Sequence, residues 1–121
     1  MAGEALAVHE SDREGVRVIE AFGELDIATA PRLCSSIDAA RIQRVRRMMI
    51  DLTGVDFCDS TGLRALIGAS AEMRASGGRL VVACNPRSGV SRLLDVTGSR
   101  ETLLVFDSAE AALTSVSNVS T

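Results

Sequence analysis

Residues 51–63 read Asp51-Leu52-Thr53-Gly54-Val55-Asp56-Phe57-Cys58-Asp59-Ser60-Thr61-Gly62-Leu63. The apolar run over residues 45–52, centred on Met48-Met49-Ile50, predicts a buried strand. Apolar and small side chains then recur at helical spacing, which predicts a helix over residues 60–76: Leu63, Leu66, Ile67 and Ser70. We interpret the residues between as a short loop, so Ser60 is expected at the start of a helix that follows a buried strand.

Four further segments have the composition of strands. Residues 16–22 are β-branched and apolar and end at Gly23. Residues 80–84 form a continuous apolar run, which is typical of a central strand covered on both faces. Residues 103–106 predict a short strand, and residues 5–8 predict an edge strand.

Residues that are typical of helix starts lie between these strands. Thr29, Asn85 and Ser108 are candidate N-caps, and a proline follows the first two closely. Strands that alternate with helices indicate an α/β fold with a mostly parallel, mixed sheet of four to five strands packed with about four α-helices. We expect one domain over residues 1–121, with a frayed tail at 117–121.

The composition excludes several classes of function. All 13 basic residues are arginine and the only histidine is His9, so lysine chemistry, histidine triads and histidine-based metal sites lack their residues. A net charge of -3 without Trp or Tyr argues against nucleic acid as a partner. We see neither a signal peptide nor a membrane span, and we expect a cytoplasmic protein without a cofactor or a metal.

Ser60 is open to two interpretations. Its position at a helix N-terminus is typical of a capping hydroxyl. The same position in a strand-to-helix loop exposes the hydroxyl to modification, and a phosphate there would meet free backbone N–H groups and the positive end of the helix dipole. An enzymatic role is disfavoured, because Cys58 stands where a nucleophile elbow needs glycine and no general base follows. A Ser60 hydrolase therefore remains the weakest alternative.

Two segments of the chain carry a family resemblance. The run Gly23-Glu24-Leu25-Asp26-Ile27-Ala28-Thr29-Ala30-Pro31 resembles the first hallmark of STAS-domain anti-sigma factor antagonists, and residues 51–63 resemble the phosphorylation-site segment of that family. The resemblance extends over essentially the whole chain, including Leu93-Leu94-Asp95-Val96-Thr97-Gly98. Both hallmarks occur in order in a stand-alone domain, which makes the resemblance specific.

The resemblance implies a partner-switching protein that has no enzymatic activity. The unphosphorylated form would bind an anti-sigma factor kinase of the GHKL type and free the sigma factor. Phosphorylation of Ser60 would end that complex, and a PP2C-type phosphatase would restore it; Thr61 is the second choice of phosphoacceptor. The residues expected at the partner surface are Glu24, Asp26, Asp56, Asp59, Ser60, Thr61, Gly62 and Arg64.

Some expectations stay open. The alternative function is a STAS scaffold or small-ligand-sensing module that binds other STAS proteins, and a monomer is the default assembly. Cys58 fits a buried apolar thiol better than a redox switch. The cluster of Arg41, Arg44, Arg46 and Arg47 either docks an acidic partner or simply places cations at a helix end.

Overall fold

The sheet is the centre of the fold. A computed structural model describes residues 6–117 and shows five strands in the order β1-β2-β3-β4-β5. Their bounds are β1 Ala7–Arg13, β2 Val16–Leu25, β3 Arg47–Cys58, β4 Arg79–Ala83 and β5 Leu104–Phe106. β1 pairs antiparallel with β2, and the other three pairs are parallel. The predicted mixed and mostly parallel sheet is therefore confirmed.

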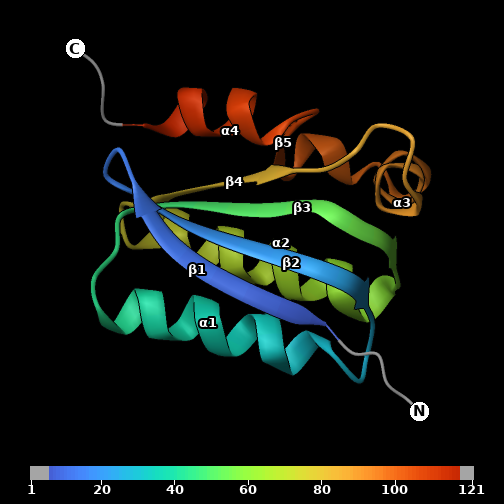
Figure 1. Ribbon diagram of the computed structural model, residues 1–121, viewed down its shortest axis with the longest axis horizontal. Coiled ribbons are helices and arrows are strands. Elements are labelled where there is room, and N and C mark those ends of the chain that lie inside the picture. Colours follow the sequence, from blue (N-terminus) through green and yellow to red (C-terminus); the bar gives the residue numbers. More distant parts are fainter. Residues whose placement is uncertain (1–5, 118–121) are drawn as a thin grey trace.

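Helices cover both faces of this sheet. They are α1 Ala30–Ile42, α2 Ser60–Ala75, α3 Gly89–Thr97 and α4 Ala109–Val116, with a short 3-10 turn at Ser99–Glu101. α1 and α2 lie against one face and α4 against the other, while α3 lies at the end of the sheet toward which β3 runs (Figure 1). The four predicted helices are thus confirmed. None of the helices over residues 6–117 is long and apolar enough to cross a membrane.

Alternation along β3 divides the core into two parts. Met48 and Ile50 are buried toward α1 and α2, together with Leu33 and Leu66. Met49 points to the opposite face and belongs to the smaller cluster under α4. Because successive side chains of a strand alternate between faces, a strand buried on both faces reads as an unbroken apolar run. The predicted burial of β3 and β4 is confirmed.

The predicted loop between residues 52 and 59 was wrong. β3 continues to Cys58 because β2 also continues, to Leu25, and the two strands stay paired up to the register Leu25↔Cys58. Gly54 permits this pairing, since a Cβ there would lie 2.5 Å from the ring of Phe22. Ser60 therefore follows the end of a long paired strand with only one residue between.

The start of α3 also differs from the prediction. Asn85 and Pro86 do not begin the helix, because Asn85 forms a turn in which its side chain accepts from the Arg87 N–H. Ser88 is the N-cap and accepts from the Ser91 N–H at 3.2 Å. The predicted cap at Ser108 is confirmed.

Two predictions concern the ends of the chain. The N-terminal edge strand exists, but it runs over Ala7–Arg13 rather than over residues 5–8, and residue 5 lies outside the described part. The frayed tail was predicted for residues 117–121, of which only Ser117 is described.

Candidate functional site

Asp59 joins the two hallmark segments. Its backbone N–H donates to the Leu25 carbonyl at 3.1 Å, and its Oδ2 accepts from the Ile27 N–H at 3.2 Å. Its Oδ1 accepts from the Gly62 N–H at 2.9 Å, which makes Asp59 the N-cap of α2. A single carboxylate thus fixes the end of β2 to the start of α2 and satisfies a first-turn N–H that the helix leaves open.

Of the two interpretations of Ser60, the one that makes it the helix cap was wrong. Ser60 is the first residue of α2 and is exposed, and its hydroxyl makes no hydrogen bond among residues 6–117. Asp59 takes the capping role because its extended backbone aims the carboxylate at the first turn. The Ser60 hydroxyl therefore lies exposed at the start of α2 and takes no part in the hydrogen bonding of residues 6–117.

Asp26 and Thr29 build the turn that faces this helix start. The Asp26 carboxylate accepts from the backbone N–H groups of Ala28 and Thr29 at 2.9 and 3.0 Å. The Thr29 hydroxyl donates to the Glu24 carbonyl at 2.7 Å. Thr29 precedes α1 as predicted, but its side chain stabilises the preceding turn instead of capping the helix. The first hallmark is therefore a rigid turn whose Ile27 N–H reaches Asp59.

Gly62 lets α2 approach β2 closely. It is buried, and a Cβ there would lie 2.7 Å from Leu25 Cγ and 3.0 Å from Cys58 Sγ. Thr61 is half-buried beside it. The remaining residues predicted at the partner surface are exposed or half-buried: Glu24, Asp26, Asp56, Asp59 and Arg64.

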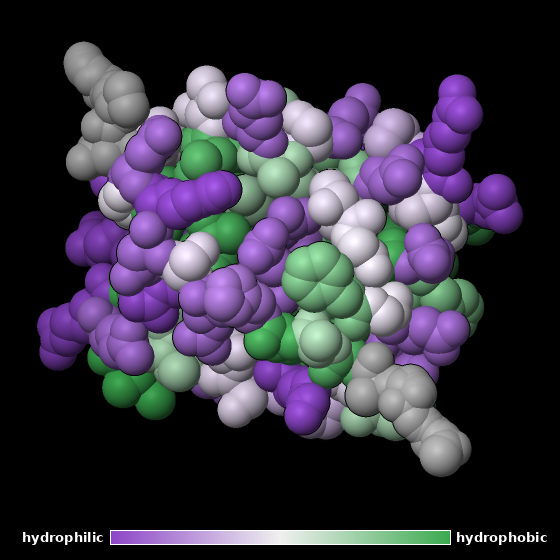
Figure 2. Space-filling model, in the orientation of Figure 1, coloured by the Kyte–Doolittle hydropathy of each residue, from purple (hydrophilic) through white to green (hydrophobic). Residues whose placement is uncertain are grey.

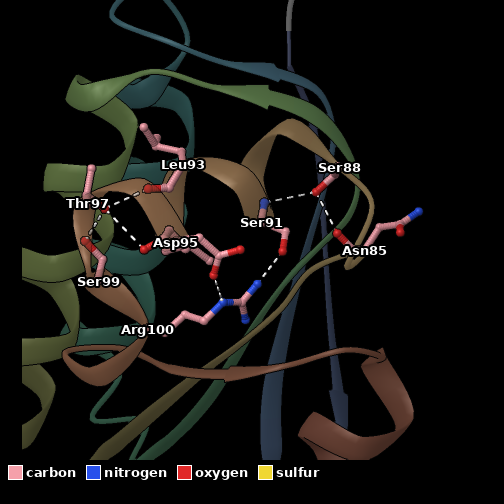
Figure 3. A network of polar contacts seen from close by, with 9 residues as sticks. Asn85, Ser88, Ser91, Leu93, Asp95, Thr97, Ser99 and Arg100 are labelled. Atoms are coloured by element: carbon pink, nitrogen blue, oxygen red, sulfur yellow. Dashed lines mark hydrogen bonds and ion pairs between the residues drawn. The ribbon is translucent and has the colours of Figure 1, made fainter.

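Helix α3 completes the rim of the site, which the sequence did not indicate. Gly89 lies against the backbone of β3, since a Cβ there would be 2.6 Å from the Asp56 carbonyl oxygen. Figure 3 shows the polar network that holds α3 in place. Arg100 donates to Asp95 at 2.6 Å and to the buried Ser91.

Exposed apolar side chains were also missed by the sequence analysis. Ile27 is 72% exposed and Phe57 47% exposed, although both lie within the hallmark segments. Phe57 is paired with Glu24 in the sheet. The signal in the sequence that could have identified these two side chains is an apolar residue within an acidic segment. Around Ser60 the surface therefore combines apolar contact area with carboxylates.

The thiol of Cys58 is buried beneath the start of α2, beside Gly62. Burial, and secondly the charge of Asp59, raises the pKa of the Cys58 thiol to about 12. The thiol donates to the Asp59 carbonyl at 3.4 Å. Because the reactive form of cysteine is the thiolate, this environment favours an inert structural residue.

We expect Cys58 to resist alkylation in the folded protein. At pH 9 a thiol of pKa about 12 is roughly one part in a thousand thiolate. Iodoacetamide followed by peptide mass spectrometry should label half-buried Cys34 well before Cys58. In urea the alkylation rates of the two cysteines should converge. Equal alkylation rates in the folded protein would contradict the assignment of Cys58 as an inert buried thiol.

The same pKa shift predicts a loss of stability in alkali. Because folding raises the pKa of Cys58, its contribution to stability is complete below the unfolded value near 9. The contribution is lost as the pH rises toward about 12. Urea unfolding at pH 8 and pH 10.5 should show this loss, and Cys58→Ala should reduce the difference between the two midpoints. An unchanged difference would contradict the role of this thiol.

Known proteins are similar to this chain over nearly its whole length. The family described as "STAS domain" matches residues 9–112. The anti-sigma F factor antagonist of Paenibacillus polymyxa is 31% identical over 95% of this chain and 98% of its own. Anti-sigma-F factor antagonist RsfB of Mycobacterium tuberculosis is 32% identical over 95% of this chain and 93% of its own.

A solved structure agrees with these matches. The crystal structure of an anti-sigma factor antagonist from Mycobacterium paratuberculosis superposes with a TM-score of 0.84 and 28% identity, covering 92% of this chain and 93% of that one. The five-stranded mixed sheet and four helices are common to both. The sequence match, the shared fold and the junction of the two hallmarks lead to one conclusion: the chain belongs to the STAS domain family.

Proposed function

We propose that this chain is an anti-sigma factor antagonist whose partner binding is switched by phosphorylation of Ser60. The observation that carries the proposal is the hydroxyl of Ser60, which is exposed at the start of α2 beside the Asp59 cap and makes no hydrogen bond within residues 6–117. The relatives named as anti-sigma factor antagonists support the same role. The unphosphorylated form binds an anti-sigma factor kinase of the GHKL type, and the sigma factor is released.

The partner surface surrounds Ser60. Ile27 and Phe57 supply exposed apolar area, and Glu24, Asp56 and Arg64 supply charges around it. An apolar centre with a polar rim is the usual composition of a binding surface. Phosphorylation adds about −1.5 to −2 charges at its middle, where desolvating the phosphate opposes binding.

Phosphorylation leaves the fold in place. The Asp59 carboxylate already accepts from the Gly62 N–H, so a phosphoryl group on Ser60 meets an adjacent negative charge. Repulsion between the two directs the phosphate outward, toward the partner side. The modification therefore acts on binding. A PP2C-type phosphatase reverses it, and the protein acts as a cytoplasmic monomer that catalyses no reaction of its own.

Site-mapped mass spectrometry tests the switch. The protein is incubated with ATP and the purified anti-sigma factor kinase of its own organism, alongside Ser60→Ala and Thr61→Ala. We expect one phosphoryl group on the wild type and on Thr61→Ala, mapped to Ser60, and none on Ser60→Ala.

Two results would overturn the assignment of the switch to Ser60. One is modification that survives Ser60→Ala. The other is an unmodified wild-type protein when the kinase phosphorylates another antagonist in the same assay. Either result would favour the alternative of a STAS scaffold that binds other STAS proteins.

A further inference from the structure

An open cleft lies at the end of the sheet opposite Ser60. Its volume is about 550 Å³, and four arginines line it: Arg46, Arg47, Arg74 and Arg79. The length of α2 separates the cleft from Ser60, because Arg74 lies 14 positions after Ser60, which is about 21 Å of helix. Figure 1 shows the amino ends of β3 and β4 at the left, and on the face drawn in Figure 2 hydrophilic and hydrophobic side chains are interspersed at that end.

The backbone brings these arginines together through Arg46. Its carbonyl accepts from the Arg79 N–H at 2.8 Å, and its guanidinium donates to the Gly77 carbonyl at 3.3 Å. Gly77 has φ +86°, and a Cβ there would lie 3.0 Å from the Arg46 guanidinium. These hydrogen bonds connect the turn after α2 to the segment before β3. They orient the Arg46 guanidinium and bring the other arginines close to it.

The charges in the cleft are not neutralised by the fold. Arg47 and Arg79 are neighbours in the parallel pair of β3 and β4, so their side chains leave the same face of the sheet. Like charges in such a position repel each other. No carboxylate lines the cleft among residues 6–117, and over the same residues the four arginines form no ion pair.

We propose that this cleft binds the diphosphate group of a small anion. Guanidinium groups donate in a planar fork that matches phosphate oxygens, and four of them in one concave site suit several negative charges. Ser70 adds a hydroxyl at the wall. A bound diphosphate relieves the repulsion between Arg47 and Arg79, so binding and folding are coupled.

Calorimetric titration of the full chain tests the site with inorganic pyrophosphate as the probe. We expect saturable binding that Arg47→Gln and Arg79→Gln each weaken at least tenfold. Arg92→Gln removes an exposed arginine from α3, outside the cleft, and should change the affinity less than twofold. A parallel titration with ADP distinguishes a nucleotide from the free ion, since saturable binding of either supports the site and the tighter one identifies the source.

A second measurement does not depend on the ligand. Without anion, Arg79→Gln should raise the melting temperature because it removes the repulsion with Arg47; with pyrophosphate, the wild type should gain more stability than the variant. Ser60→Ala should bind pyrophosphate like the wild type, which separates this site from the phosphorylation switch. Absence of saturation, equal binding of citrate, or equal affinity of Arg79→Gln would overturn the proposal.

Discussion

Ser60→Glu should weaken binding of the anti-sigma factor partner roughly a hundredfold, because it places a fixed negative charge at the centre of the proposed interface. The fold should remain intact. Ser60 is exposed and its hydroxyl has no hydrogen bond within residues 6–117, so the substitution removes no native contact of that group. An acidic side chain in the first turn of a helix is also tolerated by the helix dipole. We therefore expect a melting temperature close to that of the wild type.

Two matched variants separate the effect of a negative charge at residue 60 from the effect of side-chain size and from that of the protein's net charge. Ser60→Gln has nearly the shape of the glutamate without its charge and should bind much better than Ser60→Glu. Thr114→Glu adds the same charge at an exposed position of α4, on the other face of the sheet, and should bind like the wild type. Calorimetry with the purified partner gives the affinities. Equal losses for the glutamine and glutamate variants would show that shape, and not charge, controls the complex.

The sequence was sufficient for the elements whose signals are local. Apolar runs predicted β4 and the first half of β3, helical spacing predicted α2, and Ser108 was recognised as a cap from its own neighbourhood. Each of these signals arises from residues that are close in the chain, so pattern and structure report the same contacts. A common surface of the two hallmarks was expected only from the family resemblance, and the structure brings them together because β2 and β3 are parallel neighbours in the sheet.

The features that were missed depend on contacts between distant residues. Residues after Leu52 continue as a strand only because β2 offers them a partner. Asp59 caps α2 with one carboxylate oxygen and accepts with the other from the Ile27 N–H, which lies 32 residues away. The close approach of Gly89 to Asp56 has the same origin. Tertiary contacts determine where such a strand ends and which side chains meet, and a local sequence pattern does not contain those contacts.

Gly62→Ala should lower the free energy of unfolding by about 1–3 kcal/mol, the usual cost of adding a methyl group to a packed interior. The new Cβ would lie 2.7 Å from Leu25 Cγ, and Leu25 is fully buried between β2 and α2. Because Leu25 is fully buried, we expect the added methyl group to push α2 away from the sheet. The same shift lengthens the hydrogen bond from Ile27 to Asp59 and displaces Ser60.

Gly68→Ala in the same helix is the control. A Cβ at Gly68 meets no atom within 4 Å, so only the helix propensity changes, and alanine should raise the free energy of unfolding by about 0.5–1 kcal/mol. The same substitution, glycine to alanine, should therefore change the free energy of unfolding in opposite directions at the two positions when it is measured by urea unfolding. If both substitutions stabilise the protein, the junction of α2 with β2 is loose, and the fixed position of Ser60 loses its structural basis. If Gly62→Ala destabilises and also slows phosphorylation of Ser60 by the kinase, the packing at Gly62 sets the geometry of the switch.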